Sequence, residues 1–287
     1  MKNHFFISML AAAALLGGLT ACNGKLDKAP RADQVPENAV RITASIGNPF
    51  AATRSMPLGT EEEQGKFNVG DEIFVSTPGS QRATYRFDGT VWVPKDGKYL
   101  LWKEDMERFN AYYPAESGEN PFSYVHPTDQ SSTEKIAKAD LMSVGLDQAK
   151  TKEALHFTMR RWTTRLIVEI AGFKSEFPGD AKVENVRFHN KSNASAPQRT
   201  YIPYAKGEGK TGSTYTVLVR GDAAYNTISL EVGGKTMTAK LSEITYDSGL
   251  SYTYRLTVGK EKLETTEVTV SDWTGSAIIP GGEAKAN

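Results

Sequence analysis

Cys22 is the only cysteine in the 287-residue sequence, and its thiol is the most reactive nucleophile that the chain offers. A single cysteine cannot form an intramolecular disulfide or a cysteine-rich metal centre. It follows a short apolar run, Phe5 to Leu16, which is preceded by Lys2. A positive start, an apolar segment of roughly 7–15 residues and then small residues are typical of a secretory signal, and a membrane-spanning helix takes about 20 apolar residues. We therefore expect an exported chain.

The residues Leu19-Thr20-Ala21-Cys22 resemble a bacterial lipobox. The resemblance implies that residues 1–21 are a signal peptide, removed just before Cys22, and that the Cys22 sulfur carries a diacylglycerol. Stable anchoring takes two or more acyl chains, because each buried CH₂ group contributes only about 0.8 kcal/mol. The expected product is a lipoprotein tethered to the outer membrane through Cys22. The alternative is an incidental cysteine in an ordinary signal peptide.

Other residues with reactive side chains lack the partners that catalysis or metal binding requires. His126, His156 and His189 have no second ligand at metal-binding spacing. Ser132-Thr133-Glu134-Lys135 fits Ser-x-x-Lys, a four-residue pattern that arises by chance, and no supporting motif follows it. Gly207-Glu208-Gly209-Lys210-Thr211 resembles part of a phosphate loop, but Tyr204 stands where the first glycine is required. We expect no catalytic residues, no metal site, no cofactor and no enzymatic activity.

Charge and aromatic content bear on the binding partners. The chain has 34 basic and 34 acidic residues, a balance that does not favour a nucleic-acid partner. Four tryptophans could form a stacking platform for sugars, but their neighbours alternate between apolar and polar residues, which favours core positions for Trp92, Trp102, Trp162 and Trp273. A lipid-anchored, glycan-binding β-sandwich protein of the outer membrane is the alternative function, and clustered exposed tryptophans would support it.

The elements that must position these residues are short strands. Val40, Ile42, Ala44 and Ile46 alternate with polar residues, which predicts a strand with one buried face. Asp88-Gly89 between alternating apolar residues predicts a hairpin over 83–93. The remaining strands are expected near 72–75, 100–102, 109–113, 139–144, 155–159, 166–170, 183–188, 200–204, 215–220, 227–232, 235–241 and 252–258. Residues 117–138 are expected to form a polar loop, and residues 145–152 a connection.

About 15 short strands with frequent turn signals are typical of β-sandwiches. The length favours two sandwich domains, so the expected organisation is a signal peptide at 1–21, a flexible tether at 22–38, an N-terminal β-sandwich at 39–153 and a C-terminal β-sandwich at 154–287.

The order of several segments resembles the fimbrillin family of Bacteroidales, the Mfa-like lipoprotein subunits of type V pili. The segments that carry the resemblance are Gly70 to Val75, Tyr85 to Trp92, Phe109 to Pro114, Asp129 to Ser131, Ala139 to Met142, Leu155 to Phe157, Arg165 to Val168, Tyr252 to Val258 and Val268 to Trp273. They are collinear over most of residues 40–275. The resemblance implies an all-β fold of two transthyretin-like β-sandwich domains in tandem.

The resemblance also implies an assembly mechanism. Such subunits are cut at the surface by an arginine- or lysine-specific protease, which removes the lipid and the first strand and opens a groove. A strand of another subunit then fills the groove. Arg54 is the candidate cleavage site, in a pattern-free stretch that a protease can reach. The candidate removable strand consists of Val40, Ile42, Ala44 and Ile46, and the candidate donor strand, within 267–280, contains Val268, Val270, Ile278 and Ile279.

The expected function is therefore that of a fimbrial subunit or an accessory tip or anchor pilin in cell adhesion. Its expected partners are other pilin subunits, in a homo- or heteropolymer, the outer membrane through Cys22, and a host or bacterial surface ligand. The short chain, and Pro280 with Gly281-Gly282 after the donor residues, favour a tip, minor or anchor subunit. The alternative is that Val40 to Ile46 is a permanent strand and that Arg54 is an ordinary loop residue.

Overall fold

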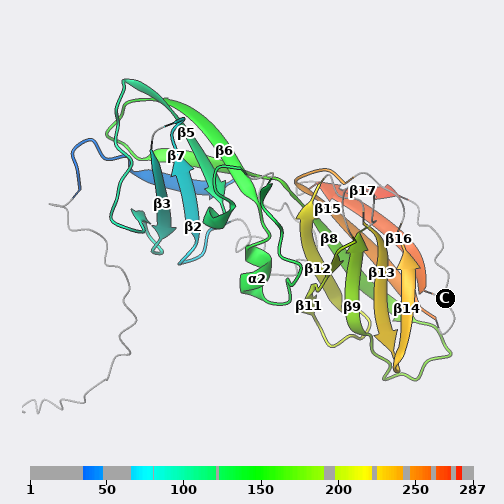
Figure 1. Cartoon of the computed structure of the whole chain (residues 1–287). Coiled ribbons are helices and arrows are strands. Elements are labelled where there is room, and N and C mark those ends of the chain that lie inside the picture. Colours follow the sequence, from blue (N-terminus) through cyan, green and yellow to red (C-terminus); the bar gives the residue numbers. More distant parts are fainter. Residues whose placement is uncertain are drawn as a thin grey trace, which may run out of the picture.

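The computed structural model describes residues 35–47, 66–79, 81–120, 123–190, 198–221, 225–241, 246–259, 263–272 and 276–279. Within these ranges strands dominate, and they form three sheets. Figure 1 shows the strands in two groups, with the short helix α2 (Thr133–Ala137) between them. The predicted all-β class is confirmed. The division into two tandem domains stays a prediction.

The first sheet has seven strands in the order β1-β7-β6-β5-β2-β3-β4. They are β1 (Ile42–Ile46), β2 (Glu72–Ser76), β3 (Arg82–Phe87), β4 (Trp92–Pro94), β5 (Met106–Tyr113), β6 (Met142–Ala149) and β7 (Leu155–Arg161). β1 pairs in parallel with β7, whereas the other neighbours are antiparallel. The first strand along the chain is thus an edge strand that joins the sheet next to the last one.

The predicted Asp88-Gly89 hairpin is present between β3 and β4. The Oδ1 atom of Asp88 accepts hydrogen bonds from the N–H groups of Thr90 and Val91, each 2.8 Å long. Gly89 has a φ of +105°, a conformation that glycine adopts without a steric penalty. Trp92 is buried while Val91 is half exposed, so the tryptophan faces the core at this position.

The remaining strands form a four-stranded sheet, β10-β9-β13-β14, and a six-stranded sheet, β11-β12-β8-β15-β16-β17. They are β8 (Thr163–Phe173), β9 (Glu184–Asn190), β10 (Thr200–Tyr201), β11 (Tyr204–Lys206), β12 (Thr214–Arg220), β13 (Tyr225–Val232), β14 (Lys235–Lys240), β15 (Leu250–Val258), β16 (Leu263–Asp272) and β17 (Ser276–Ile279). Leu166 and Val217 of the larger sheet share one core with Phe188 and Ile228 of the smaller sheet, and all four are fully buried. This pair of sheets is a sandwich.

Two of the expected boundaries differ from the structure. Leu155–Arg161, which the sequence places in the C-terminal sandwich, is β7 of the first sheet, and sheet membership changes at Trp162, between β7 and β8. Residues 145–149, expected in a connection, continue β6 because β5 supplies backbone partners as far as Ala149. Both differences arise from pairing with strands distant in sequence, which local alternation does not report.

Candidate assembly site

The predicted removable strand forms a continuous inward row with its neighbour. Ile42, Ala44 and Ile46 of β1 lie opposite three residues of β7 in parallel register: Leu155, Phe157 and Met159. Ile42 and Ile46 are buried, Ala44 packs against the same core, and the β7 partners are at most 2% exposed. Burial of one such isoleucine contributes about 1.5–3 kcal/mol. β1 is therefore an edge strand that supplies part of the core.

The residues just before β1 close the other side of the first sheet. The Val40 N–H donates to the carbonyl of Leu100 over 2.7 Å, and the Trp102 N–H donates to the carbonyl of Asn38 over 2.9 Å. The hydroxyl of Tyr85, on β3, donates to the Val40 carbonyl over 2.8 Å and accepts from the Leu100 N–H over 3.2 Å. The segment 38–47, which we call the strap, thus contacts both ends of the sheet and seals its core.

The solvent side of the strap is held by one histidine. Thr43 Oγ1 lies 3.0 Å from His156 Nδ1, and Ser45 Oγ lies 2.9 Å from His156 Nε2. His156 is exposed on β7, as an alternating strand residue would be. These contacts connect two strands and make no metal site. Among the residues that the structure describes, no group of three or more His, Cys, Asp or Glu residues is placed to hold a metal ion.

A buried polar cluster lies beyond the end of β1. The Nε of Arg161 donates to both carboxylate oxygens of Asp140, at 3.0 and 2.9 Å, and the hydroxyl of Thr163 donates to the same carboxylate over 3.0 Å. The Nε of Arg165 donates to the hydroxyl of Ser251 over 2.8 Å. Burial, and secondly the charge of Arg161, lower the pKa of Arg165 to about 9. The cluster thus brings two buried arginine side chains together with one tightly held carboxylate.

A second carboxylate faces the same space from β2's side. Asp71 accepts a 3.1 Å hydrogen bond from the hydroxyl of Tyr113 and a 2.7 Å bond from the N–H of Asn68. Burial raises the pKa of Asp71. Together these groups surround a cavity of about 330 Å³, which also has Ile46 of β1 and Leu218 of β12 in its wall. The end of the strap therefore borders the junction between the two groups of sheets.

The segment between β5 and β6 makes contacts across this junction. It contains the short 3-10 helix η2 (Ala115–Ser117) and α2. The side chain of Gln130, fully buried, accepts a hydrogen bond from the N–H of Leu218 and donates one to its carbonyl, each 2.8 Å long. Ile136 and Ala139 pack against the Leu218 side chain. A segment of the first half thereby docks on β12 of the second.

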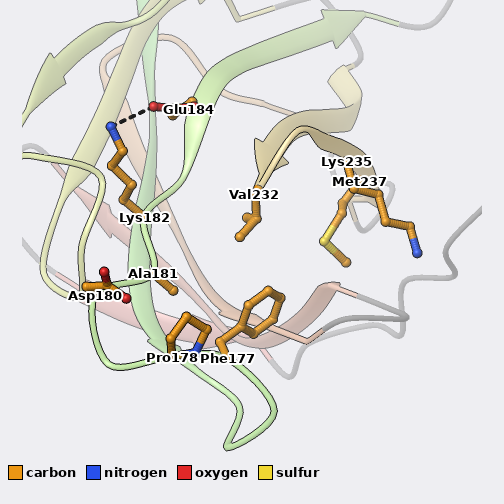
Figure 2. Close-up of a pocket in the computed structure, with 10 residues that line it drawn as sticks. Phe177, Pro178, Asp180, Ala181, Lys182, Glu184, Val232, Lys235 and Met237 are labelled. Carbon is orange, nitrogen blue, oxygen red and sulfur yellow. Dashed lines mark ion pairs between the residues drawn. The ribbon is translucent and has the colours of Figure 1, made fainter.

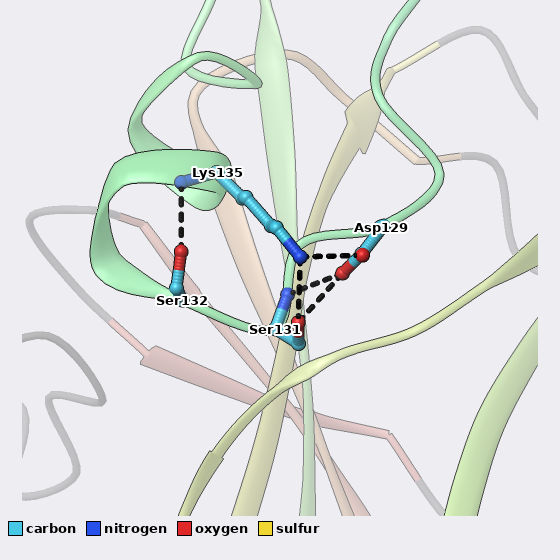
Figure 3. A network of polar contacts seen from close by, with 4 residues as sticks. All are labelled: Asp129, Ser131, Ser132 and Lys135. Atoms are coloured by element: carbon cyan, nitrogen blue, oxygen red, sulfur yellow. Dashed lines mark hydrogen bonds and ion pairs between the residues drawn. The ribbon is translucent and has the colours of Figure 1, made fainter.

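The Ser-x-x-Lys match lies in this segment and has a structural role. The hydroxyl of Ser132 caps α2 by accepting the Lys135 N–H over 3.3 Å, while the Lys135 ammonium group pairs with Asp129 at 2.6 Å (Figure 3). This pairing, together with hydrogen bonds from Ser131, lowers the pKa of Asp129 to about 2. A lysine held by a carboxylate is not placed to activate Ser132 as a nucleophile.

A separate apolar cleft of about 510 Å³ lies at one end of the second group of sheets. Figure 2 shows Phe177, Val232 and Met237 around it, with the ion pair of Lys182 and Glu184 at 2.7 Å on its rim. Sugar-binding sites usually offer a tryptophan or tyrosine face, and neither occurs among the described residues that line this cleft. Trp92 and Trp102 are buried and only Trp162 is exposed among the three described tryptophans, which weakens the glycan-binding alternative.

Several candidate residues lie outside the described residues: Cys22, Arg54, Trp273 and the signal peptide. The candidate donor residues lie on the terminal hairpin, where Val268 pairs with Ile279 and Thr269 with Ile278. β16 and β17 form the edge of the six-stranded sheet, and one ladder, between β15 and β16, joins this hairpin to the rest of that sheet. Sequence reasoning missed Gln130, Asp140 and Arg161. Its only signal was the break in alternation at Arg160-Arg161-Trp162.

The fold defines an all-β protein in which an edge strand and the residues before it cover part of the core of the first sheet. A fimbrillin-like family model matches residues 59–273, and the chain belongs to this family of structural, non-enzymatic proteins. The match begins after β1, so the strap itself lies outside it. The predicted resemblance is thereby confirmed.

Solved structures show the same fold. A candidate cell adhesion protein from Bacteroides uniformis is 17% identical, with a TM-score of 0.57 over 83% of this chain and 100% of the other. A second one, from Bacteroides ovatus, is 14% identical, with a TM-score of 0.55 over 88% and 99% of the two chains. No curated protein matches the chain. In the described part of the chain, no helix has the length and apolar character needed to cross a membrane.

Proposed function

We propose that this protein is a structural subunit of a surface fimbria, of the type V pilus kind, that assembles by protease-triggered strand exchange in cell adhesion. Family membership supports the fimbrial role. The observation that carries the exchange step is the strap: one edge strand and the residues before it cover a continuous apolar row. Its removal exposes unpaired backbone groups and apolar side chains, which a strand from another subunit can satisfy.

The acceptor groove follows from the contacts of the strap. Loss of β1 uncovers Leu155, Phe157 and Met159 and leaves five positions of β7 without a partner strand. Two buried isoleucines contribute several kcal/mol at about 1.5–3 kcal/mol each, so a cleaved strap stays bound until another strand replaces it. Cleavage after Arg54 thus makes the strap exchangeable, and the incoming strand completes the reaction.

The terminal hairpin is the proposed donor. It is the edge of its sheet, and it carries the alternating residues Val268 and Val270 on β16 and the consecutive residues Ile278 and Ile279 on β17. Export as a lipoprotein through Cys22 would bring the subunit to the outer membrane before cleavage. A subunit that keeps its lipid would serve as an anchor, and one that receives a donor strand but offers none would serve as a tip.

Replacement of Arg54 by alanine tests the cleavage step. In the native cell, Arg54→Ala is expected to abolish the lipid-free mature form and its polymers, because the strap stays covalently attached. Intact mass and N-terminal sequence give the readout: the wild type is expected to start at Ser55, and the variant at acylated Cys22. Arg41→Ala, at an exposed arginine just before β1, is the matched control and is expected to mature normally. Normal polymerisation of Arg54→Ala would refute this mechanism.

A further inference from the structure

The strap fills its groove through four side chains at alternate positions: Val40, Ile42, Ala44 and Ile46. The valine and the two isoleucines are at most 7% exposed, and the alanine packs against the same core. A strand that replaces the strap has to fill these positions, because a missing side chain leaves a cavity in the core and a polar one loses its hydration there. The groove therefore requires four apolar side chains in one row on the inward face of the incoming strand.

The groove also contacts polar groups of the strap. On the outward face, the hydroxyls of Thr43 and Ser45 lie 3.0 and 2.9 Å from the two ring nitrogens of His156. Along the backbone, the Val40 N–H donates to the Leu100 carbonyl over 2.7 Å, so a proline at this position would lose that bond. An incoming strand with threonine or serine at the two outward positions keeps the histidine contacts.

The terminal hairpin of this chain matches the centre of that pattern. In the register that fits best, residues 268–271 of β16, Val-Thr-Val-Ser, take the place of residues 42–45, Ile-Thr-Ala-Ser. Both sequences alternate an apolar residue with a hydroxyl residue, and alternate side chains of a strand lie on opposite faces. The valines of the hairpin then face the core, and its hydroxyls fall at the two positions that contact His156.

The same register is unfavourable at both ends. It places Thr266 at the position of Val40 and Asp272 at the position of Ile46. Val40 is fully buried, and Ile46 belongs to the apolar core of the first sheet. A threonine hydroxyl loses its hydration at the first of these positions, and a carboxylate loses considerably more at the last. The hairpin therefore suits only two of the four inward positions.

Other registers of the hairpin do not remove this mismatch. Residues 263–287 contain no four apolar side chains at alternate positions, whichever direction the strand runs. The nearest match uses β17, where Ala277 and Ile279 fill the third and fourth positions, but Gly275 then leaves the second, buried position empty. β15 has four such side chains, but β8 and β16 flank it on both sides, so it is not an edge strand that can leave its sheet.

On the basis of the proposed strand exchange, we propose that the groove of this chain receives a strand from a different kind of subunit, and that Thr266 and Asp272 disfavour assembly of the chain with itself. The partner strand has apolar side chains at four alternate positions, with a threonine or serine on either side of the third. The hairpin of this chain then serves the groove of another subunit. The assembly is a heteropolymer in which this chain has a defined place.

Competition for the groove tests the inference. In the chain without its signal peptide, the recognition sequence of a site-specific protease replaces the residues around Arg54, so that one cut leaves the strap bound without a covalent link. An isotope-labelled peptide of residues 38–47 and a competing peptide are added together, and native mass spectrometry measures which one the chain retains. The peptide of residues 264–273 is expected to bind at least about tenfold more weakly than the strap peptide, because two of its inward residues are polar.

Substitutions in the hairpin peptide identify the positions responsible. The Thr266→Val, Asp272→Ile double variant is expected to bind within about threefold of the strap peptide, because all four inward positions are then apolar. Asp272→Ile alone is expected to give most of this gain. Glu267→Gln, at the position of the exposed Arg41, is the matched control and is expected to change binding by less than about twofold.

The outcomes separate the two proposals. Equal retention of the hairpin peptide and the strap peptide overturns the inference and leaves strand exchange intact. No gain from Asp272→Ile also overturns it, because the charged groups of the cavity beside Ile46 would then accept the aspartate. Failure of the labelled strap peptide to enter the cut chain, even when the chain is refolded in its presence, overturns strand exchange and the inference that depends on it.

Discussion

At the scale of single residues, two Arg–Asp pairs show that environment decides the value of an ion pair. Arg108 and Asp147 pair across β5 and β6 at 2.8 Å with side chains 52% and 64% exposed. Arg161 and Asp140 pair at 2.9 Å with side chains only 4% and 14% exposed. Exposed pairs are screened by water, whereas removing one partner of a buried pair leaves a charge without compensation.

The two pairs therefore respond differently to truncation. We expect Asp140→Ala to lower the free energy of unfolding by about 3–5 kcal/mol, because the buried Arg161 side chain loses the carboxylate to which its Nε donates. We expect Asp147→Ala to lower it by less than about 1 kcal/mol. Urea denaturation of both variants checks this, and similar small losses at the two sites would show that the Arg161 pair is better hydrated than its burial indicates.

At the scale of elements, the strap is the part of the chain on which the proposed assembly depends. It is held by a parallel ladder to β7 on one side and by hydrogen bonds to residues 100–102 on the other. Tyr85 connects the two parts, because its hydroxyl contacts both Val40 and Leu100 inside the core. Because Tyr85 contacts the strap but is not part of it, removing its hydroxyl weakens strap binding and leaves the strap sequence and β7 unchanged.

Tyr85→Phe is expected to lower the free energy of unfolding by about 1–3 kcal/mol, since one buried carbonyl and one buried N–H lose their partner. After cleavage at Arg54, the variant is also expected to release the strap faster, as followed by mass spectrometry of the freed fragment. Tyr112→Phe, on a half-exposed tyrosine of β5, is the control and is expected to change neither quantity appreciably. Unchanged release by Tyr85→Phe would mean that the β7 ladder alone holds the strap.

At the scale of the whole molecule, the two groups of sheets are joined by an inserted segment as well as by the chain between β7 and β8. The Gln130 side chain forms hydrogen bonds with the N–H and the carbonyl of Leu218, as a neighbouring strand would. Ile136 of α2 packs against the Leu218 side chain. Ile46, near the end of the strap, lies at the same junction. The end of the strap and the segment that joins the two groups therefore border one cavity.

Gln130→Leu is expected to separate the unfolding of the two groups. Loss of its hydrogen bonds leaves the Leu218 N–H and carbonyl buried without them, which costs about 1–3 kcal/mol at the junction. Scanning calorimetry is expected to show one transition for the wild type and two for the variant. Gln148→Leu, at a partly buried glutamine of β6 that takes no part in the contacts with Leu218, is the control and is expected to keep a single transition. A single, merely shifted transition in Gln130→Leu would argue against this role of the junction.

Local patterns in the sequence were sufficient for most strands and for the Asp88-Gly89 hairpin turn, because side-chain alternation and turn chemistry depend on neighbouring residues. The strand over Val40 to Ile46 and its inward row were predicted in this way. Trp162, expected in the core with Trp92 and Trp102, is exposed instead, because it lies between β7 and β8, where the chain passes from one sheet to another. Alternation reports that a residue lies in a strand but does not report what covers that strand.

The sequence by itself determined the all-β class, the alternation of the strap and the family. Only the tertiary structure decided that β7 belongs to the first sheet, that the strap closes both ends of that sheet, and that Arg161, Arg165 and Asp140 share a buried cavity with the end of β1. These features join residues up to 113 positions apart in the chain. Their cause is pairing and burial between distant segments, which no local pattern encodes.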